Sequence, residues 1–156
     1  MFITREVVIL HVHTQYSLLD GQASVARLVD KAMQNGMKGI AVTDHGNMFG
    51  IKEFTNYVNK KNSGPKGEIK DLKKRLVGIE AGSIECEDKE AEVAACKAKI
   101  VEAENKLFKP IIGCEMYVAR RTMDLKEGKQ DQSGYHLIVL AKNETGYHNL
   151  VKLVSH

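Results

Sequence analysis

The chain alternates short apolar runs with stretches whose apolar residues recur at helical spacing. Four apolar runs, each bounded by polar residues or glycine, predict β-strands. These runs are residues 7–13, 39–42, 110–118 and 135–140. The first run is almost uninterrupted, which is typical of a strand buried on both faces. We therefore expect residues 7–13 to form a buried strand.

Amphipathic helices are predicted between these strands. Ser24 and Asn143 can each cap a helix whose apolar residues lie three and four positions apart. A third helix is predicted from Phe49 to Val58, ending in the polar segment 60–65, which contains glycine and proline. Apolar strands alternating with amphipathic helices are typical of an α/β fold. We expect a parallel sheet, either open or part of a longer barrel.

The segment 62–108 interrupts this alternation. Two groups of apolar residues recur there at helical spacing, on either side of a turn at Gly82 and Ser83. They are Ile69, Leu72, Leu76 and Ile79, then Val93, Cys96, Ile100, Ala103 and Leu107. This pattern predicts a helical hairpin. Residues 60–75 hold seven basic and two acidic side chains, and residues 80–92 hold six acidic and one basic. The hairpin is either solvated, with arms that attract one another, or a docking surface for a partner.

Composition places the chain among ordinary globular proteins. It has 156 residues, 43% hydrophobic and 28% charged, which allows one domain with or without an insertion. A net charge of +3 is too small for a domain dedicated to coating nucleic acid. Three cysteines without a CxxC pair favour a reducing compartment. Because no apolar run is long enough for a signal peptide or a membrane span, we expect a cytoplasmic protein with no membrane partner.

His11 and His13 are the first candidates for chemistry. They lie two positions apart in a predicted strand, so their rings leave the same face. Two neutral imidazoles on one face make good metal ligands. An isolated pair of this kind also arises by chance, so the spacing alone leaves both explanations open.

Further candidates lie near the ends of the predicted strands. Asp20 follows the first strand, His45 ends the second beside Asp44, Glu115 lies in the third, and His136 opens the fourth. Each alone can be a turn residue, an exposed strand residue or an ordinary histidine. In an α/β fold, however, successive parallel strands end at one edge, where active sites form.

These candidates together predict a metal site. Mixed imidazole and carboxylate ligands suit zinc, manganese or iron better than calcium. Clustered divalent ions suit phosphoester hydrolysis, because they activate water and neutralise phosphate oxygens. No separate catalytic side chain is assigned.

Other residues are set aside. His148 and His156 belong to the last predicted helix and are expected at the surface. Cys114 should point to the opposite face of its strand from Glu115 and be buried.

The candidate residues stand in segments that resemble a known family. Residues 11–21, 43–50, 109–118 and 136–150 closely resemble the opening motifs of the polymerase and histidinol phosphatase (PHP) domain of bacterial DNA polymerase III alpha subunits. The resemblance covers residues 7–61 and 109–155, which identifies 62–108 as an inserted hairpin in a partial PHP domain spanning 1–156.

The resemblance implies a distorted (β/α)7 TIM-like barrel with up to three divalent ions, zinc or manganese. By similarity, His11 and His13 would hold one ion, Glu115 would bridge it to a second shared with His136, and Asp20 with His45 would serve a third. The remaining ligands of the family would lie beyond His156, so we expect this chain to be part of a longer protein.

For that longer protein the resemblance implies DNA-directed DNA synthesis, with DNA and other replicase subunits as partners. The PHP site itself would be a metal-dependent phosphoesterase, a 3′–5′ exonuclease. The alternative is a non-catalytic module that stabilises the polymerase and binds a separate proofreading exonuclease subunit. A stand-alone small-substrate phosphatase would not explain the polymerase-specific segments. For the fragment alone we expect little catalysis, and self-association through an open barrel edge.

Overall fold

The computed structural model describes residues 7–132 and 134–155, which form a mixed α/β structure. Its elements are α1 (Val25–Gln34), β1 (Gly39–Val42), α2 (Ile51–Lys61), α3 (Ser63–Glu80), α4 (Lys89–Asn105), β2 (Lys109–Val118), a 3-10 turn (Gly128–Gln130), β3 (Tyr135–Leu140) and α5 (Glu144–Val154). The chain divides into two compact units, one from residues up to 57 and from 109 onward, the other from 58–108. Within the described ranges, no helix is both long and apolar enough to cross a bilayer.

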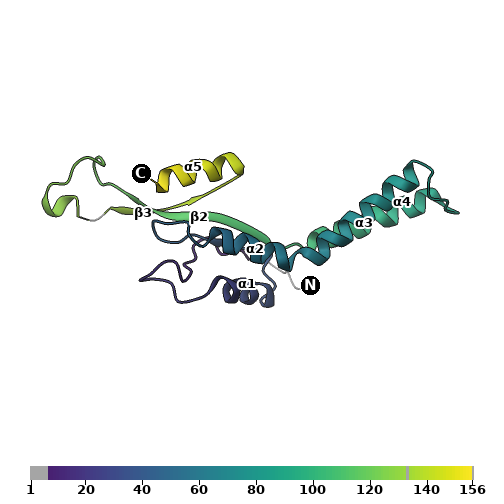
Figure 1. Ribbon diagram of the computed structural model, residues 1–156, viewed down its shortest axis with the longest axis horizontal. Helices are drawn as coiled ribbons and strands as arrows, with labels where there is room; N and C mark the ends of the chain where they lie inside the picture. The colour runs from purple at the N-terminus through teal and green to yellow at the C-terminus, as the bar shows by residue number, and fades with distance from the viewer. Residues whose placement is uncertain (1–6, 133, 156) are drawn as a thin grey trace, which may run out of the picture. The chain divides into compact units, whose positions relative to one another are not determined.

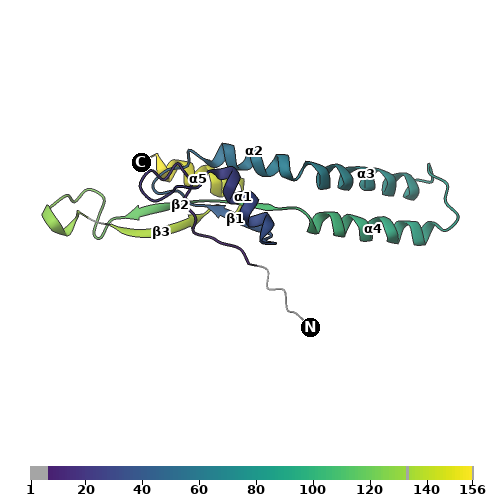
Figure 2. The same ribbon diagram turned by 90° about the horizontal axis from the view of Figure 1, so that it is seen from below.

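The sheet of the first unit has the order β1-β2-β3. Strands β1 and β2 are parallel, with Gly39 opposite Lys109, as the alternation of strands and helices predicts. Strands β2 and β3 lie side by side (Figure 2). They are antiparallel, with Cys114 opposite Val139, so the expectation of a parallel fourth strand is wrong. A parallel connection needs a crossover, usually a helix, whereas the described part of the loop between β2 and β3 contains one 3-10 turn and no longer helix. The described residues show this three-stranded sheet and no closed barrel.

Residues 7–13 do not form the buried strand that their pattern predicts. Their only strand-like pairing is a single parallel bridge between Ile9 and Ile40, and Val7 and Leu10 are about half exposed. The segment still runs along β1, because the amide of Thr43 donates to the carbonyl of Val12 over 2.9 Å. His11 and His13 are therefore held beside the sheet.

The helices of the first unit follow their predicted caps. The Ser24 hydroxyl accepts from the Arg27 amide at the start of α1, and the Asn143 side chain accepts from Gly146 at the start of α5. Helix α1 buries Val25 and Val29. Figure 1 shows α1 and α2 on one side of the sheet and α5 on the other, as in a layered α/β fold.

The second unit is the predicted helical hairpin. Helices α3 and α4 lie side by side (Figures 1 and 2), joined by a turn in which Gly82 has φ of 73°. Its core contains the predicted apolar residues, which include Ile69, Leu72, Leu76, Ile100, Ala103 and Leu107. The hairpin is confirmed as a structure; its origin as an insertion stays a prediction.

The predicted break at residues 60–65 is wrong. Only Asn62 separates α2 from α3, because Gly64 and Pro65 fall in the first turn of α3, where a missing amide donor is tolerated. The side chain of Asn62 is buried and pairs with both backbone groups of Phe108: it donates to the carbonyl over 2.8 Å and accepts from the amide over 2.9 Å. Asn62 therefore closes the base of the hairpin.

Candidate metal centre

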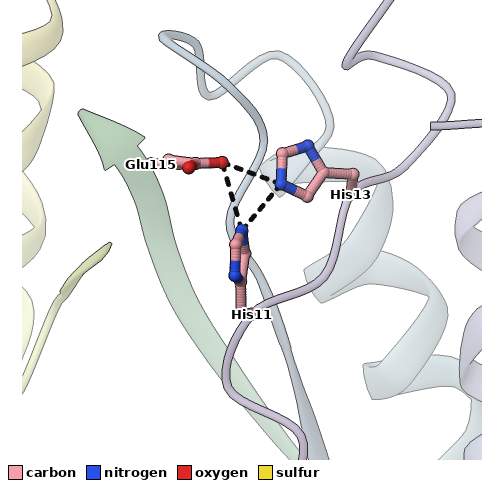
Figure 3. Close-up of side chains that lie close together, drawn as sticks. All are labelled: His11, His13 and Glu115. Atoms are coloured by element: carbon pink, nitrogen blue, oxygen red, sulfur yellow. Dashed lines mark hydrogen bonds and ion pairs between the residues drawn. The ribbon is translucent and has the colours of Figure 1, made fainter. Parts of the chain in front are cut away.

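His11, His13 and Glu115 meet at three neighbouring atoms (Figure 3). The Nε2 atoms of the two histidines are 2.9 Å apart, and they lie 3.1 Å and 2.8 Å from Oε2 of Glu115. Two histidines two positions apart thus share one side of their segment, as the sequence predicts. The carboxylate arrives from β2, far away in the sequence.

The three short contacts among His11, His13 and the ionised Glu115 cannot all be hydrogen bonds at once. Each neutral imidazole nitrogen either carries one hydrogen or offers one lone pair, and an ionised carboxylate only accepts. While Glu115 is ionised, any distribution of protons on the two rings leaves one of the three contacts with two lone pairs or two hydrogens facing each other. A shared cation would remove the conflict, because donor atoms about 3 Å apart suit ligand bonds of roughly 2.0–2.2 Å.

His45 and Asp20 adjoin this triangle. A parallel bridge pairs His45 with Glu115, and the amide of Gly46 donates to the carbonyl of Glu115 over 2.9 Å. Nδ1 of His45 lies 3.1 Å from Oδ2 of Asp20 and 3.8 Å from Oε2 of Glu115. Nε2 of His45 is buried and has no hydrogen-bond partner among the described residues. A buried imidazole nitrogen without a partner is costly, and a metal ion would complete it.

His136 reaches the cluster because β3 is antiparallel. Its register places His136 opposite Tyr117, so that His136 is a diagonal neighbour of Glu115 on the same face of the sheet. Nδ1 of His136 lies 2.9 Å from Oε1 of Glu115. A parallel β3 would have placed this histidine, which stands near the start of its strand, at the opposite edge.

Glu115 is the centre of the arrangement and is 4% exposed. Burial raises its pKa, but the hydrogen bond from His11 and the charges of His11, His45 and His13 outweigh burial, so the net pKa is lowered. Its Oε2 faces His11 and His13, and its Oε1 faces His136. The carboxylate is therefore ionised and can serve two neighbouring positions.

A supporting set of polar residues escaped the sequence analysis. The hydroxyl of Ser17 lies 2.7 Å from Nδ1 of His13 and accepts from the amide of His45 over 3.1 Å. Asp44 is buried and accepts from the amide and hydroxyl of Thr14 over 2.6 and 2.8 Å. Serine, threonine and aspartate next to a predicted loop are usually turn residues, so only their place in the family-like segments could have distinguished them.

The six predicted residues form three overlapping groups of potential metal donors. Within each group the donor atoms lie within 4.8 Å of one another. The groups are His11, His13 and Glu115; His13, Asp20 and His45; and His45, Glu115 and His136. The unsatisfied triangle, the orphaned nitrogen of His45 and the mixed imidazole–carboxylate donors all fit divalent transition metals.

Residues set aside from the sequence lie outside the cluster. Cys114 is buried, its thiol donates to the carbonyl of Asp44, and burial raises its pKa. His148 is exposed on α5. His156 lies outside the described residues.

An open cavity of about 580 Å³ adjoins the cluster at Asp20 and His45. Tyr117 borders it and packs on His45 with ring centroids 4.4 Å apart. The exposed side chains of Leu18, Leu19 and Phe49 also line it. Of the six candidate ligands, Asp20 and His45 thus border an open cavity in which a substrate could lie.

Comparison with known proteins identifies the family of this chain. A family model for the PHP domain matches residues 10–156. The chain is 38% identical over 149 residues to the DNA polymerase III subunit alpha of Borreliella burgdorferi, 39% over 147 residues to that of Treponema pallidum, and 30% over 156 residues to that of Aquifex aeolicus. These alignments cover 94%, 94% and 96% of this chain but only 9%, 9% and 10% of those relatives.

Proposed function

Because the chain belongs to the PHP domain family, we propose that its histidine–carboxylate cluster binds divalent metal ions and hydrolyses phosphoesters. The observation that carries the proposal is the sharing of Glu115 between His11 and His13 on one oxygen and His136 on the other. In this proposal His11, His13 and Glu115 hold one ion, Glu115 and His136 a second, and Asp20 with His45 a third. Zinc or manganese suits these ligands.

The protein's own residues prepare the donors. If Nδ1 of His13 donates to Ser17, its Nε2 presents a lone pair toward Glu115 and His11. Asp44 holds Thr14, the residue after His13, and so fixes the loop that carries this ligand. Bound divalent ions would supply activated water and neutralise phosphate oxygens.

The role in the longer protein follows the relatives. We propose that the chain is a part of the PHP domain of a replicative DNA polymerase III alpha subunit, and that its sheet is a portion of a distorted (β/α)7 barrel. DNA synthesis would then belong to the whole protein, with DNA and other replicase subunits as partners. The PHP site would act as a 3′–5′ exonuclease.

Metal binding tests the first step. Elemental analysis and calorimetry with Zn²⁺ and Mn²⁺ should show binding to the metal-free chain. Glu115→Gln should weaken binding at least about tenfold, because it removes the charge shared by the donor groups. His148→Gln, which changes an exposed histidine outside the cluster, is the matched control and should bind like the original chain. Absence of binding would leave the docking module for a separate exonuclease subunit as the better explanation.

Hydrolysis is tested in the complete protein. A 5′-labelled single-stranded DNA should be shortened from its 3′ end, and His11→Ala with His13→Ala should abolish the shortening. Metal binding without this difference would contradict exonuclease activity while leaving the metal site in place.

We also propose that the isolated chain self-associates through the outer edge of β3. Within the described residues β3 pairs only with β2, and Tyr135 and Leu137 are more than half exposed. Unpaired strand edges invite pairing with another chain. Light scattering should show a mass that rises with concentration, and Leu137→Lys should keep the chain monomeric. A monomer at all concentrations would contradict this proposal.

A further inference from the structure

Helix α3 carries four exposed lysines on one side, Lys66, Lys70, Lys73 and Lys74, which we call the lysine stripe. At about 100° per residue these lysines fall within an arc of roughly 100° on the helix. Of the acidic residues of the same helix, Glu68 and Asp71 lie roughly 60° or more beyond the edge of that arc, and Glu80, the last residue of the helix, lies roughly 20° beyond it. The stripe therefore has no acidic side chain of its own helix within it.

The charge of the stripe is mostly uncompensated. Lys70 and Lys74 make no ion pair within the part of the chain that the structure describes. Lys66 donates to the side-chain oxygen of Asn59 over 2.8 Å, a neutral partner, and Lys73 lies 3.6 Å from Glu104. A shallow groove of about 530 Å³ follows the lysines, with Ile69 and exposed Val77 as its apolar members. The net charge of +3 for the whole chain thus conceals a concentrated positive face.

We propose that the lysine stripe binds the phosphate backbone of a nucleic-acid duplex without reading its sequence. Lys66 to Lys74 spans about 12 Å of helix. One strand of a duplex presents a phosphate about every 3.4 Å along the axis, so three or four phosphates face this length. Lysine contacts to phosphates position a protein on a duplex but carry no sequence information.

The side chains on the stripe argue against other occupants. The cores of protein–protein interfaces are enriched in aromatic residues, methionine and arginine and depleted in lysine. Between Lys66 and Val77 the arc carries only lysines and Val77, so it lacks the anchors of such an interface. Single strands are usually held by stacking of bases on aromatic rings, and the stripe has no aromatic side chain. Among these partners, a duplex backbone is the one that a row of lysines without aromatic side chains favours.

The neighbouring backbone leaves room for a phosphate strand. Gly67 lies beside the stripe in the second turn of α3, and glycine inside a helix costs about 1 kcal/mol relative to alanine. A Cβ built at Gly67 would meet no atom within 4 Å, so packing does not require glycine there. The acidic segment 80–92 would repel phosphates, which confines the duplex to the stripe.

The test measures duplex binding by the full chain as a function of salt. Fluorescence anisotropy with a labelled DNA duplex of unrelated sequences should give a plot of log affinity against log salt with a slope of about −3.6 for four phosphate contacts. Affinity would then fall about 150-fold between 50 and 200 mM KCl. Lys70→Gln with Lys74→Gln should reduce the slope to about −1.8 and the fall to about 12-fold.

The matched control is Lys97→Gln with Lys99→Gln, which removes the same charge from exposed positions on α4. It should keep the original slope, and circular dichroism checks that both variants remain helical. Equal loss of slope in the two variants would show a response to overall charge and overturn the proposal. It would also be overturned if a polyglutamate peptide bound the stripe as tightly as the duplex does, since the partner would then be an acidic polypeptide.

Discussion

Asp44 holds the loop behind the histidine cluster with one carboxylate. It is 1% exposed and accepts both the amide and the hydroxyl of Thr14. Asp44→Asn would turn an amide group toward one of these donors. We expect the free energy of unfolding to fall by about 1–3 kcal/mol, measured by urea titration. Asp124→Asn, at an exposed loop position, should change it by less than about 0.5 kcal/mol. Similar losses in both variants would contradict the anchoring role of Asp44.

The loop between β2 and β3 contains a second anchored carboxylate, Asp131. Its hydrogen bond from Arg121, and then that from the amide of Glu127, lower its pKa below the ordinary 3.8. A lowered pKa in the folded chain means that this carboxylate stabilises the loop above pH 3.8, and that the contribution is lost as the pH falls through the folded-state pKa. Carboxyl NMR should find the Asp131 midpoint below 3.8. Arg121→Gln should raise the midpoint, whereas Lys129→Gln in the same loop should leave it almost unchanged.

Single residues also mark the limit of the sequence analysis. The six predicted side chains do lie together in the structure, although their role as metal ligands stays a prediction. Histidines and a strand glutamate were conspicuous because few other roles bring them to one edge of a sheet. Ser17, Thr14 and Asp44 were not, because their hydrogen bonds depend on the closeness of residues about 30 positions apart. Only the folded chain reveals such pairs.

At the scale of elements, the stability of the α3–α4 hairpin depends on the two hydrogen bonds between the Asn62 side chain and the Phe108 backbone. Asn62→Ala would leave the buried amide and carbonyl of Phe108 without partners. We expect a loss of about 2–4 kcal/mol, seen as faster hydrogen exchange throughout residues 58–108. Asn35→Ala, at an exposed helix end, should leave that exchange unchanged. Unchanged exchange in the Asn62 variant would show that helix packing alone closes the hairpin.

Helices were predicted more reliably than strands for a physical reason. The start of a helix is determined by nearby residues: a capping side chain such as Ser24 or Asn143, followed by apolar residues at helical spacing. The direction of β3 is not determined by its own residues, because an apolar run fits both a parallel and an antiparallel strand. The segment that connects it to β2 determines the direction. Whether residues 7–13 are buried also depends on elements far away in the sequence, which the apolar pattern of these residues does not reveal. The barrel, similarly, could be expected only from the family resemblance.

At the scale of the whole molecule, the two compact units predict separate responses to metal. If ions bind the cluster, Zn²⁺ at about 100 times its Kd should stabilise the unit that contains it by about 2.7 kcal/mol. Hydrogen exchange should slow in residues 7–57 and 109–155 and stay the same in α3 and α4. Equal slowing in both units would show that they unfold as one.

The antiparallel pairing of β2 with β3 has a practical consequence for the loop that joins them. The two ends of the loop 119–134 lie next to each other, because Val118 at the end of β2 pairs with Tyr135 at the start of β3. Its length can therefore change without shifting the ladder that sets Glu115 and His136. A fluorescent peptide grafted there would report on events at the histidines from close by, while the strands beneath it keep their alignment.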